Sequence, residues 1–381
     1  MSELKKTLRC PCVVLFFALL AAVAVWDVLS PDAAMSELEN RVLKQSPPLS
    51  AAMLVDNRWT KEYGEYVREQ FVMRDGWLKT HSLLEQGLLK IELGGVWCAR
   101  DGYLMAKTPY DAADARRVAE TNIKAICSLG EKHPGRVYVM LIPSASNILA
   151  GRLRFDPPRM DENALMDVAY RRLREAGIGA IDLRGDFRAH DESGGQVYYR
   201  TDHHWTTDGG AFLAYSAYCR AVGRDATMPP ANLRRNVGGF LGTNYAKSLQ
   251  IGASPDDLVY YDFPNEISIE KHAPDGSTYV ERAPMMAFEK LLSYDKYGAF
   301  LHGNNGYSHI DGDGHGKVAV IKDSYGNSFV PFLTQNYKDI EIFDLRGRPN
   351  LSELVDSDCD ILVLYSFSTF TQDTELAWLS A

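Results

Sequence analysis

The stretch VAVIKDSYGNSFVPFL, residues 318–333, decides the fold class of this chain. Its first five residues form a short apolar run typical of a buried strand, and a helix is expected from Asn327. Ser324 therefore stands in a strand–turn–helix setting, where backbone N–H groups and the helix dipole stabilise a developing oxyanion. Lys322 occupies the first glycine position of the G-x-S-x-G pattern, so the match is half complete. A serine that only caps a helix would give the same signal.

Similar apolar runs recur along the chain and alternate with helix-like segments. The runs are residues 137–143, 178–183, 340–345 and 359–365, and the helix-like segments are 112–130, 161–176 and 206–223. Short buried strands separated by helices predict an α/β domain with a parallel sheet and helices on both faces. Residues 235–298 break this rhythm, and the runs LVYYDF, ISIEKH and STYVERA within them predict a small antiparallel, β-rich insertion.

The first thirty residues carry a membrane or export signal. Lys5, Lys6 and Arg9 precede the apolar run VVLFFALLAAVAVW, residues 13–26. The pattern predicts a cytoplasmic basic tail (1–11), a signal anchor or cleavable signal peptide (12–30), a helical juxtamembrane region packing on the main domain (31–100) and a catalytic domain (101–381). The positive flank stays inside, so the main domain is expected to be extracytoplasmic.

Composition excludes some function classes. The 381 residues are 46% hydrophobic and 24% charged, which is typical of a globular protein, and the formal net charge of −9 offers no basic surface for nucleic acid. The six cysteines include no pair with metal-ligand spacing, so free buried thiols are expected, although a disulfide outside the cytoplasm stays open.

A second motif, RTDHHWTTDGG at residues 200–210, places acid and base groups side by side. If the segment is extended, Asp202 and His204 share one face and His203 lies on the other. A carboxylate that orients an imidazole is the base half of a hydrolase triad. Two other interpretations remain at this point, a capped helix start with two partly buried histidines and a metal site using His203 and His204.

Weaker candidates surround these two motifs. Asn304 in FLHGNNG and Arg346 after the run ending at Leu345 stand where oxyanion or substrate donors are useful, but an ordinary turn and a surface arginine explain them equally. Ser144 in PSASN is a distant second choice of nucleophile. DGDGHGK, residues 311–317, begins like a calcium loop but has Lys322 where a bidentate glutamate is required. No metal or other cofactor is predicted.

The segment RTDHHWTTDGGAFLAY closely resembles the signature of the DHHW family, which is similar to the alginate O-acetyltransferase-like proteins of the SGNH-hydrolase superfamily. ELENRVLKQSPPLS, EYVREQFVMRDGW, GFLGTNYAKS, FLHGNNG and CDILVLYSFSTF extend the resemblance over residues 36 to 371. It implies an SGNH-hydrolase-like, flavodoxin-like fold. Trp205 is expected to pack and hold the turn.

By this resemblance Ser324 matches the nucleophile, His204 the general base and Asp202 its orienting carboxylate. Contacts to the substrate or the oxyanion are expected from Tyr325, Asn304, Arg346 and His203. The implied function is exported serine O-acyl transfer, with acetyl the commonest group, or acyl-ester hydrolysis on a cell-surface or secreted polysaccharide. A membrane-bound O-acyltransferase would supply the acyl group. The alternatives are a non-catalytic glycan-binding or assembly scaffold of an envelope polysaccharide machine, and a metallohydrolase.

Overall fold

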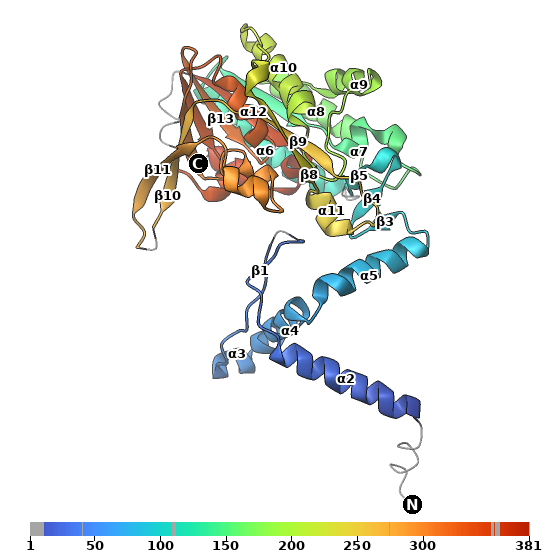
Figure 1. The fold of residues 1–381 in the computed structure, drawn as a ribbon. Helices are drawn as coiled ribbons and strands as arrows, with labels where there is room; N and C mark the ends of the chain where they lie inside the picture. Colours follow the sequence, from blue (N-terminus) through green and yellow to red (C-terminus); the bar gives the residue numbers. More distant parts are fainter. Residues whose placement is uncertain are drawn as a thin grey trace, which may run out of the picture. The chain divides into compact units, whose positions relative to one another are not determined.

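The computed structural model describes residues 11–39, 41–108, 112–273, 275–351, 354 and 359–380 (Figure 1). The chain divides into two compact units. The smaller comprises Met1–Leu89 with Leu249–Ile251, and the larger comprises Lys90–Ser248 with Gly252–Ala381. Each unit is described separately.

The smaller unit is mainly helical. Its elements are α2 (Pro11–Leu29), β1 (Met35–Ser36), β2 (Arg41–Val42), α3 (Ala51–Val55), α4 (Arg58–Gln70) and α5 (Arg74–Gly87). Helix α2 contains the predicted apolar run, none of its residues is buried, and its 19 residues are long and apolar enough to cross a membrane. Asp27 near its end accepts a hydrogen bond of 2.8 Å from the N–H of Val72.

An eight-stranded mixed sheet forms the centre of the larger unit, in the order β11-β10-β12-β14-β13-β15-β6-β7. In chain order these strands are β6 (Val137–Ile142), β7 (Gly179–Ile181), β10 (Glu266–His272), β11 (Thr278–Pro284), β12 (Tyr307–Asp311), β13 (Lys317–Lys322), β14 (Asp339–Phe343) and β15 (Asp360–Ser366). The five strands from β14 to β7 are parallel, as predicted.

At the other end the predicted parallel sheet is extended by antiparallel strands, so the sheet as a whole is mixed. Strand β12 pairs antiparallel with β14, β10 with β12, and β11 with β10. Antiparallel neighbours need only a tight turn, whereas a parallel neighbour requires a crossover of a dozen or more residues, and the chain between β10 and β11 is too short for one. The expected antiparallel strands of residues 235–298 are therefore divided: β10 and β11 extend the main sheet, while β8 (Arg234–Phe240) pairs separately with β9 (Asp256–Tyr261).

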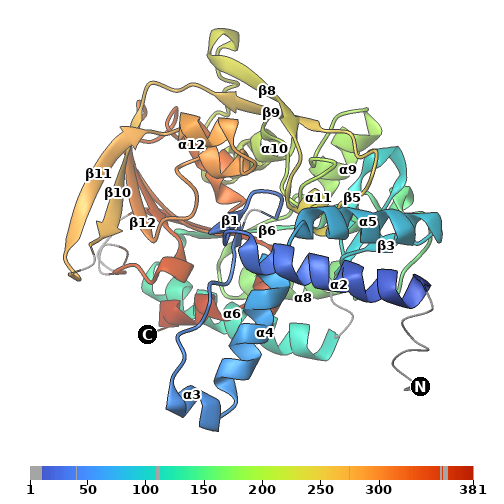
Figure 2. The same ribbon diagram turned by 60° about the horizontal axis from the view of Figure 1, so that its bottom comes forward.

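Helices cover both faces of the sheet, as predicted. They are α6 (Ala112–Lys132), α7 (Ala145–Ile148), α8 (Glu162–Glu175), α9 (Arg184–Glu192), α10 (Phe212–Val222), α11 (Thr243–Ser248), α12 (Gly326–Leu333) and α14 (Phe367–Gln372). Alternate residues of β13 point to opposite faces: Val318 and Val320 belong to the core formed with α9, α10 and α12, while Ala319 and Ile321 belong to the core formed with α6, α8 and α14. Figure 2 shows α10 and α12 on one side of the sheet and α6 and α8 on the other. Both faces of the sheet at β13 are therefore covered by apolar side chains, as expected for a strand whose apolar residues point to both sides.

A small antiparallel sheet precedes the first helix of the larger unit. Its strands are β3 (Glu92–Leu93), β4 (Val96–Cys98) and β5 (Leu104–Ala106). Strand β4 pairs with both β3 and β5, and all three strands belong to the larger unit, which begins at Lys90.

Candidate active site

Ser324 lies in the turn between β13 and α12, at the carboxyl edge of the parallel strands. The neighbouring Asp323 fixes this turn, since its carboxylate accepts hydrogen bonds from the N–H groups of Tyr325 (3.0 Å) and Ser366 (2.8 Å). Gly326 is required here because an added Cβ would lie 2.7 Å from Cβ of Lys322. Within the described part of the chain, the N–H of Ser324 has no hydrogen-bond acceptor.

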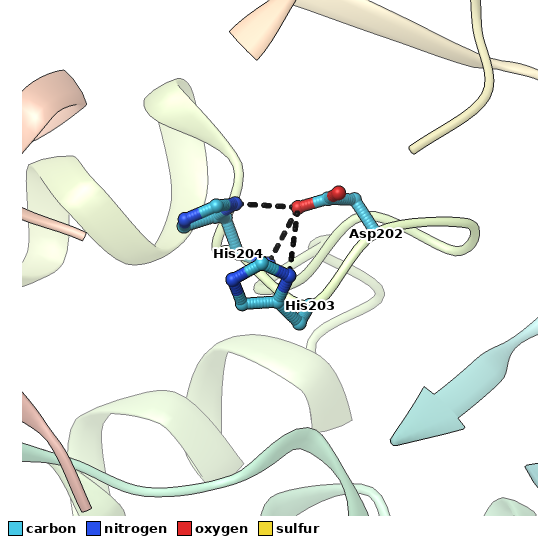
Figure 3. Close-up of side chains that lie close together, drawn as sticks. All are labelled: Asp202, His203 and His204. Atoms are coloured by element: carbon cyan, nitrogen blue, oxygen red, sulfur yellow. Dashed lines mark hydrogen bonds and ion pairs between the residues drawn. The ribbon is translucent and has the colours of Figure 1, made fainter. Parts of the chain in front are cut away.

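Asp202 and His204 meet through a tight turn rather than along an extended strand. One carboxylate oxygen of Asp202, Oδ1, accepts both the backbone N–H of His204 (2.9 Å) and a bond of 2.6 Å from its ring atom Nδ1. Figure 3 shows both histidine rings directed at this oxygen, with His203 Nδ1 farther away at 3.7 Å. The segment bends instead of running extended, and the two groups still come together.

The imidazole of His204 joins this carboxylate to Ser324. Its second nitrogen, Nε2, lies 2.8 Å from Oγ of Ser324. Because the carboxylate of Asp202 can only accept, Nδ1 carries the proton and Nε2 presents a lone pair to the serine hydroxyl. Asp202, His204 and Ser324 thus have the geometry of a nucleophile, a base and an orienting acid.

The carboxylate of Asp202 is held ionised. Its burial alone would raise its pKa, but the nearby His203 and His204 and the hydrogen bonds that it accepts outweigh burial and hold the pKa well below its usual range. Two of these bonds come from Thr243, whose N–H (2.7 Å) and hydroxyl (3.0 Å) both reach Oδ2. Gly242 lets the chain pass this close, since an added Cβ would lie 2.2 Å from Oδ2.

His203 supports the arrangement from the side. Its Nδ1 is 2.6 Å from the Thr243 hydroxyl, which itself donates to Asp202, so Nδ1 is the donor. Burial and the neighbouring His204 lower the pKa of His203. Among the described hydrogen bonds Ser324 contacts His204 and not His203, which answers the question of which imidazole faces the serine.

Tyr297 and Tyr325 pack on the His204 imidazole, and Trp205 packs on Tyr325. Tyr297 stacks on it with ring centroids 3.7 Å apart and planes at 9°, and its hydroxyl donates to the carbonyl of Ser324 (3.2 Å). Trp205 is fully buried and donates from Nε1 to Ser328 Oγ (2.9 Å), so it packs as predicted. Tyr325 packs edge-on against Trp205 and donates its hydroxyl to the carbonyl of His203.

A cavity of about 240 Å³ opens beside Ser324. It lies where β6, β13 and β15 end, the position at which open α/β sheets bind ligands. Its lining includes Lys107, Ser144, His203, Asn244, Lys247 and Tyr325.

Two predicted contacts lie outside the lining of this cavity. Asn304 accepts a hydrogen bond from Asn327 (3.2 Å), and Arg346 pairs with Asp344 (2.5 Å). Both partners bind the buried ammonium group of Lys322, at 2.7 Å and 3.2 Å. Burial lowers the pKa of Lys322, which Asp344 opposes. Asn304 and Arg346 therefore belong to a charged cluster beneath the turn.

Ser144 has a carboxyl partner instead of an imidazole. Its hydroxyl donates to Glu162 (2.6 Å) and also caps α7 through the N–H of Asn147. Burial raises the pKa of Glu162. This network holds the loop after β6, and among the described contacts Ser144 has no imidazole partner of the kind that His204 provides for Ser324.

Potential metal ligands are gathered in the same place. Asp202, His203 and His204 offer ligand atoms within 4.8 Å of one another. Both oxygens of Asp202 already accept hydrogen bonds, and Nε2 of His204 faces Ser324. A metal ion would have to displace these contacts, so the arrangement favours the serine interpretation over the metal interpretation.

Comparison with protein families identifies the chain. The family described as DHHW protein matches residues 103–343, well over half of the sequence. The chain belongs to the DHHW family. The predicted resemblance is confirmed, and the matched segment contains Asp202, His204 and Ser324.

Relatives of this DHHW protein have low sequence identity. It is 22% identical over 213 residues to a probable alginate O-acetylase AlgJ of Pseudomonas syringae pv. tomato, a match covering 55% of this chain and 51% of that protein. The chain thus spans about half the length of that curated relative.

Two solved structures share the fold. A DHHW family protein from Eubacterium siraeum has a TM-score of 0.56 at 19% identity, covering 75% of this chain and 95% of that one. PatB1 of Bacillus cereus has a TM-score of 0.57 at 22% identity, covering 72% and 97%.

Proposed function

We propose that this DHHW protein is an extracytoplasmic serine O-acetyltransferase that acts on a cell-surface or secreted polysaccharide. The observation that carries the proposal is the hydrogen-bonded series Asp202–His204–Ser324 beside a cavity. The named alginate O-acetylase among its relatives supports the choice of an acetyl group and a polysaccharide acceptor.

In the first step Oγ of Ser324 attacks the carbonyl carbon of the acetyl donor while Nε2 of His204 takes the hydroxyl proton. The ionised Asp202 stabilises the resulting imidazolium. The free N–H of Ser324 and the amino end of α12 face the negative charge that develops on the carbonyl oxygen. Collapse releases the donor's leaving group with the proton from His204 and leaves acetyl-Ser324.

In the second step a sugar hydroxyl takes the place of the leaving group. His204 removes its proton, the sugar oxygen attacks the acetyl carbon, and the bond to Oγ breaks as Oγ recovers a proton. Water in place of the sugar would give hydrolysis. His203 and Tyr325, which line the cavity, are proposed to contact the substrate, and Asn304 and Arg346 to hold the turn from beneath.

The donor is proposed to come from a membrane-bound O-acyltransferase, with α2 anchoring the chain beside it. The length and exposure of α2 support an anchor. The acetyl group would then be delivered on the extracytoplasmic side of the membrane, where the larger unit is proposed to reside.

The test uses the full chain in detergent with an aryl acetate. We expect phenol release and one acetyl adduct, located by mass spectrometry on Ser324, and loss of both in Ser324→Ala. Ser216→Ala is the matched control, because its hydroxyl only bonds back to Phe212 within α10. Equal release from wild type and Ser324→Ala, with no adduct, would contradict the proposal. Absence of both release and adduct in wild type would favour the scaffold alternative.

A further inference from the structure

A larger cavity adjoins the one beside Ser324. The second cavity, of about 620 Å³, lies between the loop after β6 and the start of α8. Thr108, Ser144 and Ser146 line both, so the two share a border. Ligand cavities commonly have volumes of ~300–1,000 Å³, so the first holds little more than the reacting groups and the second has room for a larger part of a substrate.

Two buried polar atoms along this path have no hydrogen-bond partner among the described residues. They are Oγ1 of Thr108, at the border, and Oδ1 of Asn244, in the lining of the first cavity. Asn244 is 2% exposed, and its Nδ2 donates to the carbonyl of Leu104 at 2.7 Å. That bond fixes the amide orientation, because a flipped amide would place two oxygens together, so the unpaired atom is a true acceptor.

An unpaired acceptor in a cavity calls for a ligand that donates. Leaving a buried polar atom unsatisfied is costly, and a hydroxyl group from a ligand would relieve both Asn244 and Thr108. The second cavity is lined by further polar groups: the amides of Asn147 and Asn163, which bond to each other, and the guanidinium group of Arg159, which can donate to a ligand. Hydroxyl groups repeated along a chain fit such a surface.

We propose that the two cavities form one groove for the acceptor glycan, with the modified sugar at Asn244 and Thr108 and the adjoining sugars at Arg159. This inference rests on the proposed function and adds the location and length of the acceptor site. A chain of several sugars is therefore bound more tightly than a single sugar.

The test measures binding by titration calorimetry in full-length Ser324→Ala, which removes turnover. The probes are cello-, chito- and mannuronate oligosaccharides of one to six units. In at least one series we expect affinity to rise about tenfold or more as units are added. Affinity that is independent of length in all three series, or no binding, overturns the proposal.

Two further substitutions separate binding from stability. Thr108→Val removes an unpaired hydroxyl, so we expect an unchanged or higher Tm together with binding about three- to tenfold weaker. A purely structural role for Thr108 would instead lower the Tm and leave binding unchanged.

Arg159→Ala should weaken binding of long but not of single-unit probes. Arg154→Ala is the matched control, an exposed arginine in the same loop that lines neither cavity. Equal affinities in Arg159→Ala and Arg154→Ala would overturn the proposal. The aryl acetate assay tests the proposed function independently. If acetyl-Ser324 does not form in that assay, the proposed function is contradicted, whatever the oligosaccharide binding shows.

Discussion

The carboxylate of Asp202 accepts four hydrogen bonds, two from His204 and two from Thr243, and these bonds stabilise its negative charge. In Asp202→Asn the amide N–H can donate to Nδ1 of His204, which favours the tautomer with the proton on Nε2. Nε2 then cannot accept the proton of Ser324. We expect kcat for aryl acetate to fall about 10³–10⁴-fold with little change in KM. Asp186→Asn, at an exposed surface ion pair, is the control and should retain full activity.

The same carboxylate links stability to pH. Its pKa is lower in the folded protein than its ordinary value, so the unfolded chain takes up the proton first as pH falls. The stability that Asp202 contributes is complete above about pH 4 and is lost as pH falls toward the folded pKa. Urea unfolding from about pH 7 to pH 3 should therefore show a shallower acid decline in Asp202→Asn than in wild type. Parallel curves would contradict this.

The sequence alone indicated Asp202, His204 and Ser324 as candidates, because their residue types and local spacing are typical of an acid, a base and a nucleophile. In the structure the three side chains do lie together. The sequence did not indicate the contacts that Tyr297 makes with His204 or Thr243 makes with Asp202. Tyr297 is one of two tyrosines in SYDKYGAF, and nothing in that stretch indicates stacking on a distant histidine. Thr243 reaches Asp202 only because Gly242 allows the close approach. Such contacts depend on tertiary packing.

At the scale of elements, the turn from β13 to α12 depends on Gly326. In Gly326→Ala the new Cβ would collide with the buried Lys322 side chain, which cannot move away easily. We expect a loss of about 1–3 kcal/mol in the free energy of unfolding and a fall in kcat, because Ser324 shifts with the turn. Gly185→Ala in α9, where an added Cβ meets nothing within 4 Å, should be neutral or stabilising by about 0.5–1 kcal/mol. Chemical denaturation measures both.

Strands β6, β13 and β15 could be predicted because each is mainly a short apolar run, and β14 because Ile340, Ile342 and Phe343 mark a further apolar segment. The pairing of β10 and β12 with the main sheet could not. Local periodicity identifies a strand but does not name its partner, and here the partner is decided by which edge of the sheet is left open after β14.

At the scale of the whole molecule, we expect α2 to hold the chain in a membrane. Its 19 residues approach the roughly 20 that span a bilayer, so we expect an uncleaved anchor. Membranes from expressing cells should retain the chain after alkaline carbonate extraction, with an intact mass that includes residues 1–30. Replacing Leu20 and Val23 by arginine should release it. A mature mass beginning after residue 24 would show instead that the segment is a cleaved signal peptide.

The two outer strands of the main sheet have a consequence for self-association. One edge, β7, is only three residues long, and the other, β11, is exposed along most of its length, carries Glu281 and Arg282 and ends at Pro284. Short edges and edges with charges and proline resist the addition of a foreign strand. Copies of the protein at high concentration can therefore meet edge to edge without joining into an aggregate.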